Sequence, residues 1–121
     1  MAKQQYQSLL VWQKAMDLVD LVYGLTTEFP KTELFGLTSQ SRRSAVSVPS
    51  NIAEGSQRGT DPDFGNFLLI AKGSLAELNT QLLIAYRREY IDQKQSENVS
   101  NAIEELNKML FSLHRKILPQ S

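Results

Sequence analysis

Apolar residues in this chain recur at alternating steps of three and four positions, and they do so in four separate stretches. Such spacing gathers apolar side chains on one face of an α-helix and polar side chains on the other. No stretch shows the every-second-residue alternation of a half-buried strand. The repeats therefore predict four helices, and they run from Val11 to Phe29, from Ser41 to Gly55, from Phe64 to Ala85 and from Val99 to Ile117.

Prolines and capping residues set the limits of these helices. Pro30 and Pro119 stop the first and last repeats, because proline disfavours helical backbone in the residue before it. Thr60 and Asp92 can accept hydrogen bonds from the first free amides of the third and fourth helices. We expect helices at about residues 9–28, 32–54, 61–90 and 93–118 of an all-α, antiparallel up-down four-helix bundle that forms one domain over residues 1–121.

The second helix carries a polar stripe that lacks the lysines and glutamates of an ordinary surface helix. Pro49 lies inside this helix, and Gly55 is placed to act as its C-terminal cap. The composition predicts a polar face that is at least partly buried and that fixes how helices or subunits align. The stripe consists of Gln40, Ser44, Ser47, Asn51, Glu54 and Arg58.

Two features of the other helices suggest additional contacts. The first helix has a second apolar line, which begins at Trp12 and ends at Tyr23, so its apolar arc is wider than one partner helix needs. We expect Trp12 and Tyr23 to lie either in the core or at a subunit interface. Gly73 sits in the middle of the third helix, where glycine costs about 1 kcal/mol relative to alanine. Close approach of another backbone would compensate for that cost.

Composition narrows the class of protein. The chain has 121 residues, of which 41% are hydrophobic, and it has no cysteine, which excludes disulfides and thiolate metal sites. Thirteen basic residues balance thirteen acidic ones, so no overall field attracts nucleic acid or an anionic membrane. The N-terminus has no apolar signal-peptide core. We expect a cytoplasmic protein with no membrane association.

Local charge offers one candidate nucleic-acid site. Arg42, Arg43 and Arg58 lie in residues 36–60, where Glu54 is the one acid, giving a local charge of +2. Repeated around an oligomer, these arginines could form a basic ring that contacts phosphates. Alternatively, they pair with Glu54 or with the acids of a neighbouring subunit and hold the assembly together.

Catalytic and metal-binding signatures are absent from the sequence. Glu54 and Asn51 lack a companion histidine, and Glu77 is the nearest candidate for a second carboxylate. The one histidine, His114, is not part of a Glu-x-x-His pair, so a di-iron or zinc centre is not expected. We therefore expect no enzyme activity, no cofactor and no small-molecule substrate.

The motifs in residues 9–91 resemble those of the 23S rRNA-intervening sequence protein family of four-helix-bundle proteins. This resemblance implies a homopentamer with a central channel. It also implies a relation to the accessory variability determinant protein of diversity-generating retroelements, which is a pentameric, nucleic-acid-binding relative. The motifs that carry the resemblance are Val11-Trp12-Gln13-Lys14-Ala15, Phe29-Pro30, Phe35-Gly36-Leu37-Thr38-Ser39-Gln40, Ser47-Val48-Pro49-Ser50-Asn51-Ile52-Ala53-Glu54-Gly55 and Ala71-Lys72-Gly73-Ser74-Leu75-Ala76-Glu77-Leu78.

This chain departs from the usual family pattern at three places. Ser41 stands where an aliphatic residue is common, and Ser44 stands where alanine is common. Arg88-Glu89 stands where the family often has Leu-Gly.

Two functional hypotheses follow from these observations. The first is a non-enzymatic homo-oligomeric scaffold, pentameric by resemblance, that contacts RNA or DNA through the arginines of its second helix. The second is a protein–protein interaction module with no nucleic-acid role.

Overall fold

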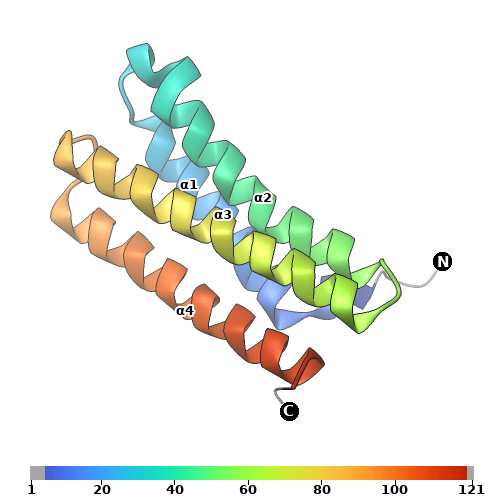
Figure 1. Ribbon diagram of the computed structural model, residues 1–121. Coiled ribbons are helices and arrows are strands. Elements are labelled where there is room, and N and C mark those ends of the chain that lie inside the picture. Colours follow the sequence, from blue (N-terminus) through green and yellow to red (C-terminus); the bar gives the residue numbers. More distant parts are fainter. Residues whose placement is uncertain (1–4, 120–121) are drawn as a thin grey trace.

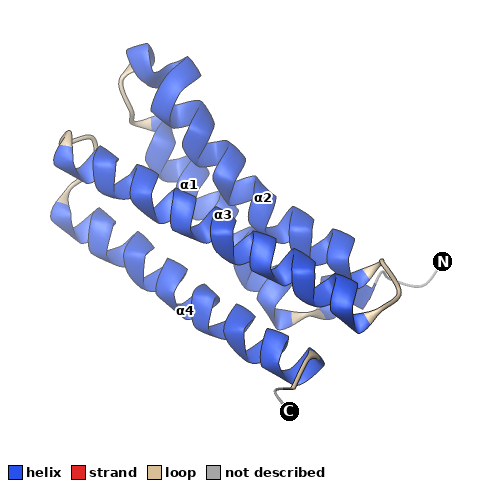
Figure 2. Ribbon diagram, viewed as in Figure 1, coloured by secondary structure: helices blue, strands red, loops and turns tan. Residues whose placement is uncertain are grey.

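The structure is a computed structural model that describes residues 5–119, and in this part of the chain it contains helices and no strands (Figure 2). This confirms the all-α helical bundle. The helices alternate in direction, so that the start of α1 and the end of α4 lie at the same end of the bundle (Figure 1). After a short 3₁₀ turn at Gln5–Ser8, the long helices are α1 (Leu10–Thr27), α2 (Ser39–Ser56), α3 (Asp61–Arg87) and α4 (Gln93–Ile117).

The helices pack in a ring in the order in which they occur in the chain. α1 contacts α2 and α4, and α3 contacts the same two helices, so α1 and α3 lie diagonally across the bundle. The core between them is built from the three-and-four repeats. Its most completely buried large side chains are Val22, Val48, Ile52, Leu68, Leu75, Leu78, Val99, Leu106 and Leu110.

The starts of α3 and α4 follow the capping chemistry of the sequence. The Thr60 hydroxyl oxygen accepts from the backbone amide of Asp63 at 3.3 Å. At α4, the Asp92 carboxylate accepts from the amide of Gln95 at 2.7 Å, while the Gln95 side chain accepts from the amide of Asp92 at 2.9 Å. This reciprocal capping box satisfies two amides that the helix itself leaves unpaired.

The expected helix at residues 32–54 begins later than periodicity indicates. Residues Lys31–Glu33 form a 3₁₀ turn and Leu34–Thr38 form a π turn, in which Gly36 has non-helical backbone angles. The carboxylate of Glu33 accepts from the amide of Leu37 at 3.0 Å and so closes this turn from the side. The regular helix therefore starts only at Ser39.

Gly55 is not the C-terminal cap of α2. The helix continues to Ser56, and Gln57 follows as the capping residue. Gly55 is buried, and a Cβ atom added to it would lie 2.6 Å from the Cβ of Phe67 in α3. Its role is to let α2 and α3 approach each other, and these two helices make the most extensive contact in the bundle.

The third helix ends at Arg87 rather than near residue 90. Glu89 has a φ of +64°, in the left-handed region, so the helix cannot continue through it. The amide of Tyr90 donates to the carbonyl of Ala85 at 2.8 Å, which closes the helix end around this left-handed residue. Glu89 thus occupies a position that usually favours glycine.

Candidate functional site

The middle of the polar stripe joins α2 to α3. The hydroxyl oxygens of Ser47 in α2 and Ser74 in α3 lie 2.8 Å apart. The Asn51 side-chain amide donates to the Ser47 carbonyl oxygen at 2.8 Å and to the Ser47 hydroxyl oxygen at 2.9 Å. Ser47 therefore accepts from Asn51 and can donate to Ser74. The three residues form a small polar network inside an otherwise apolar contact.

The remaining stripe residues have different environments. Gln40 and Glu54 are exposed, whereas Ser44 is buried. Ser41, which lies beside the stripe, is completely buried, and its hydroxyl has no hydrogen-bond partner among the described residues. The stripe is therefore buried only along the contact with α3, around Ser44, Ser47 and Asn51.

The three candidate arginines do not form one patch. Arg42 donates from Nε to the Thr26 hydroxyl at 2.8 Å and lies 4.6 Å above the ring of Tyr23, so it faces α1. Arg58 forms an ion pair with Glu54 at 2.8 Å and lies 4.8 Å above the ring of Phe67, so it faces α3. Arg42 lies in the first turn of α2, whereas Arg58 follows the end of that helix, so the two positions are about 20 Å apart along its axis.

Arg43 differs from both neighbours. It is exposed, and within residues 5–119 no hydrogen-bond or ion-pair partner is present for its guanidinium group. An unpaired guanidinium on a helix surface is free to meet a carboxylate or a phosphate from another molecule. Of the three arginines, Arg43 is thus the best placed for an external contact.

The second apolar line of α1 leads to an uncovered apolar surface. Trp12 is half-buried and packs against the core, with the ring of Tyr6 edge-on at 5.5 Å. Further along, Met16 and Tyr23 are exposed, and Tyr23 is 42% exposed. The line therefore passes from a core position to the surface.

Residues between α1 and α2 extend this uncovered surface. Phe35 in the π turn is 94% exposed, and Leu34 and Val46 are exposed beside it. Tyr23, Leu34, Phe35 and Val46 line a groove of about 480 Å³ with Arg42 and Arg43. We call this surface the α1–α2 shoulder, and its apolar members are Met16, Tyr23, Leu34, Phe35 and Val46. The exposure of Phe35 could not be read from the sequence, because it depends on the π turn.

A second uncovered apolar surface lies on α3. Leu69, Ile70, Leu83 and Ile84 are all exposed, although they belong to the central helix of the chain. Gly73 lies between the two pairs, is exposed, and has no atom within 4 Å of the place where a Cβ would be. No backbone of the protomer therefore approaches Gly73 closely, so the close approach that the sequence predicts is not made within the protomer. We call this surface the α3 outer face.

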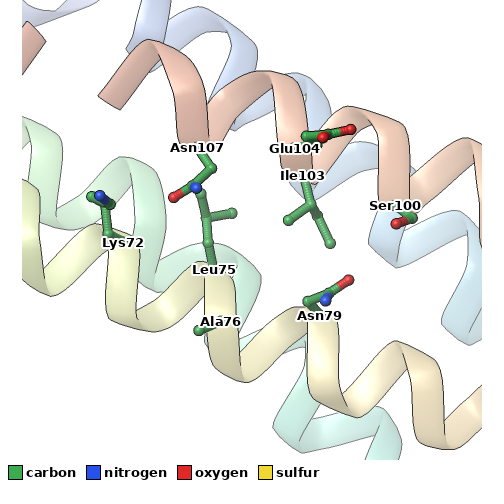
Figure 3. Close-up of a pocket in the computed structure, with 8 residues that line it drawn as sticks. All are labelled: Lys72, Leu75, Ala76, Asn79, Ser100, Ile103, Glu104 and Asn107. Atoms are coloured by element: carbon green, nitrogen blue, oxygen red, sulfur yellow. The ribbon is translucent and has the colours of Figure 1, made fainter. Parts of the chain in front are cut away.

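A polar groove of about 360 Å³ lies between α3 and α4 (Figure 3). Lys72 and Asn79 line it from α3, and Glu104 and Asn107 line it from α4. Glu77 is not among the residues that line this groove and is exposed. In residues 5–119, no group of three or more histidine, aspartate or glutamate side chains is arranged to hold a metal ion.

Glu33 is a carboxyl group whose pKa is shifted by its surroundings. Hydrogen bonds from the Leu37 amide and from the Tyr90 hydroxyl, which donates at 2.9 Å, lower the pKa of the Glu33 carboxyl; partial burial opposes them, and the nearby charge of Arg88 adds to them. This carboxylate joins the π turn before α2 to the turn between α3 and α4. Its role is to hold one end of the bundle together.

Comparison with known families identifies the group to which the chain belongs. A model of the 23S rRNA-intervening sequence protein matches residues 7–112. The chain belongs to this family. The match extends over α1, α2, α3 and most of α4, and it carries no catalytic activity with it.

A solved structure has a similar fold. It is a protein of unknown function from the S23 ribosomal protein family of Bacteroides thetaiotaomicron, 30% identical, with a TM-score of 0.81. The similarity covers 88% of this chain and 99% of that chain. None of the curated proteins matches the chain.

Proposed function

We propose that this member of the 23S rRNA-intervening sequence protein family is a non-enzymatic scaffold that assembles with copies of itself through the α3 outer face. One observation carries the proposal. An 18-residue window of α3 has a mean hydropathy of 1.2, yet only 33% of that window is buried in the protomer. α3 contributes only one of its sides to the core, so apolar side chains on its other side stay exposed to water. Burying such a surface against another molecule is favourable.

The size of the exposed surface supports association. The protomer has 7562 Å² of accessible surface, whereas a folded monomer of its mass has about 6,600 Å². A stable interface buries about 800 Å² per partner, which is similar to the difference. Part of this difference reflects the elongated shape of the bundle (Figure 1).

Gly73 provides independent support. An exposed glycine inside a helix lowers stability by about 1 kcal/mol relative to alanine, and nothing in the protomer occupies the space that its missing side chain leaves. Close approach by a helix or side chain of another copy gives the glycine a packing role. The chain also has no net charge, so copies do not repel one another at long range.

The arginines fit this function better than nucleic-acid contact. Arg42 and Arg58 already have partners within the protomer, and Arg42 lies against α1 whereas Arg58 lies against α3. A phosphate-binding stripe requires cations gathered along one surface. We therefore favour the protein–protein interaction hypothesis for these residues. Salt-sensitive binding of labelled RNA that Arg43→Ala removes would contradict it.

The test is the mass of the native assembly at micromolar concentration, measured by sedimentation velocity and native mass spectrometry. We expect a defined homo-oligomer, a pentamer by family resemblance, and we expect Ile70→Glu/Ile84→Glu to weaken association at least about ten-fold, equivalent to about 1.4 kcal/mol. The two replaced side chains are exposed, so helical content should be retained.

The matched control places two glutamates on the exposed polar surface of α4, as Asn98→Glu/Asn101→Glu, and should assemble like the wild type. A wild-type monomer at micromolar concentration would overturn the proposal. By length and composition, α3 is the one described helix that could cross a membrane. Co-sedimentation of the wild type with lipid vesicles in place of self-association would assign the α3 outer face to a membrane.

A further inference from the structure

We propose that the α3 outer face of one copy docks on the α1–α2 shoulder of the next, so that the copies join head to tail. This inference rests on the self-association proposed above and names the surface that receives α3. It requires two different faces on each protomer. Among the described residues, the α3 outer face and the α1–α2 shoulder are two such faces, and a third apolar groove lies between α1 and α4 around Leu10 and Met109.

The shoulder has the chemistry of a receiving surface. Three structural elements contribute exposed apolar side chains to it, and Phe35 is almost free of contacts within the protomer. Aromatic side chains that project from a surface are typical anchors of protein interfaces. The α3 outer face offers the complementary shape, because Gly73 leaves a gap between its two pairs of apolar side chains.

Charge favours this pairing over contact between two α3 outer faces. Glu77 is exposed and lies seven residues from both Ile70 and Ile84, at the middle of the face. A two-fold arrangement centred there would bring two Glu77 carboxylates together, and like charges at close range are destabilising. The shoulder instead carries Arg42 and Arg43, and Arg43 has no partner within the described protomer. Arg87 and Arg88, which lie beside Ile84, are at the end of the α3 outer face, and Arg87 is about 15 Å along the helix axis from Glu77.

The position of the two surfaces determines the kind of assembly. The shoulder lies between α1 and α2, whereas the α3 outer face belongs to the helix diagonal to α1 (Figure 1). The two surfaces therefore point in different directions. Contacts between unlike surfaces produce closed rings when the rotation between copies closes, and open filaments when it does not.

A complementation experiment tests the pairing. Variant F carries Ile70→Glu/Ile84→Glu on the α3 outer face, and variant S carries Phe35→Glu/Val46→Glu on the shoulder; all four side chains are exposed. Each variant alone should be monomeric. Their mixture should form a one-to-one heterodimer and nothing larger, because the intact shoulder of F receives the intact α3 outer face of S while the other two surfaces are disabled.

Each other outcome is informative. Assembly of variant S like the wild type would overturn the shoulder as the receiving surface while leaving self-association intact. A homodimer of either variant alone would show that its intact surface pairs with its own kind and would overturn the pairing. Two monomeric variants that stay monomeric when mixed would show that the two surfaces do not bind each other, which would overturn it as well. A monomeric wild type would overturn the proposed function itself, so the two failures are distinguishable.

The absence of cysteine permits a second, independent measurement. A short bis-maleimide, whose two double bonds each add one cysteine thiol, should convert the double variant Arg43→Cys/Glu77→Cys into a ladder of dimers, trimers and larger species in a denaturing gel. Glu77→Cys alone and Arg43→Cys alone should give no ladder. Efficient cross-linking of Glu77→Cys alone would show that two α3 outer faces meet and would overturn the proposal.

Discussion

Ser41 and Ser47 lie less than two turns apart in α2, yet their hydroxyls have opposite energetic roles. Ser47 completes the contact with Ser74 and Asn51, whereas Ser41 is fully buried without a hydrogen-bond partner among the described residues. Burying an unpaired hydroxyl costs about 1–3 kcal/mol. The buried hydroxyl of Ser41 therefore lowers stability rather than marking a site.

We predict that Ser41→Ala stabilises the protein by about 1 kcal/mol and that Ser47→Ala destabilises it by a similar amount. Both replacements change serine to alanine inside the same helix, so the gain in helix propensity is shared. The difference between them isolates the hydrogen bonds. Urea unfolding of both variants at one protein concentration measures it, and equal effects would contradict the assignment.

Glu89 is a second residue that lowers the stability of the folded chain. Its left-handed backbone, with φ of +64°, costs a non-glycine residue about 1–2 kcal/mol. We predict that Glu89→Gly stabilises the protein by about 1 kcal/mol, while Glu89→Ala, which keeps a Cβ, does not. Thermal unfolding of the two variants compares them. A gain with alanine equal to that with glycine would show that charge, not backbone conformation, is responsible.

Elements were predicted from the sequence more reliably than their ends. The four helices and their caps Thr60 and Asp92 could be predicted because apolar periodicity and capping each depend on residues only a few positions apart in the sequence. The π turn at Leu34–Thr38 does not follow, since it depends on a bond between the Glu33 side chain and the Leu37 amide. The periodic pattern also cannot specify on which side of α2 each arginine lies.

The contact through Glu33 predicts a pH dependence at the end of the bundle. Because the pKa of Glu33 is lowered in the folded protein, its stabilising effect is complete above the ordinary pKa of an unfolded glutamate, about 4.3, and is lost as the pH falls through the folded value. Glu33→Gln cannot lose a charge, so its unfolding free energy should fall less steeply in acid than that of the wild type.

Urea unfolding across the acid range compares the two proteins, and all other carboxylates titrate equally in both. The difference in slope therefore reports Glu33 alone. Parallel profiles would show that this carboxylate gains nothing from Leu37 and Tyr90.

At the scale of the whole molecule, the sequence predicted the bundle but not which surfaces remain uncovered. The apolar residues of α3 divide between two sides of the helix, and the sequence pattern records only that they are apolar. Leu68 and Leu69 are neighbours in the chain, yet Leu68 is fully buried and Leu69 is half-exposed. Such a distinction requires the positions of α2 and α4. The candidate surfaces of this protein could therefore be defined only from the structure.

The two-sided apolar character of α3 also links folding to the amount of protein present. One side of the helix is buried when the chain folds, and under the self-association proposed above the other side is buried when a second copy binds. Mass action would then make the apparent stability rise with total concentration, because association draws on the folded form alone. A protomer diluted below the dissociation constant of the assembly would keep its core but expose the four apolar side chains of the α3 outer face to any chaperone or protease it meets.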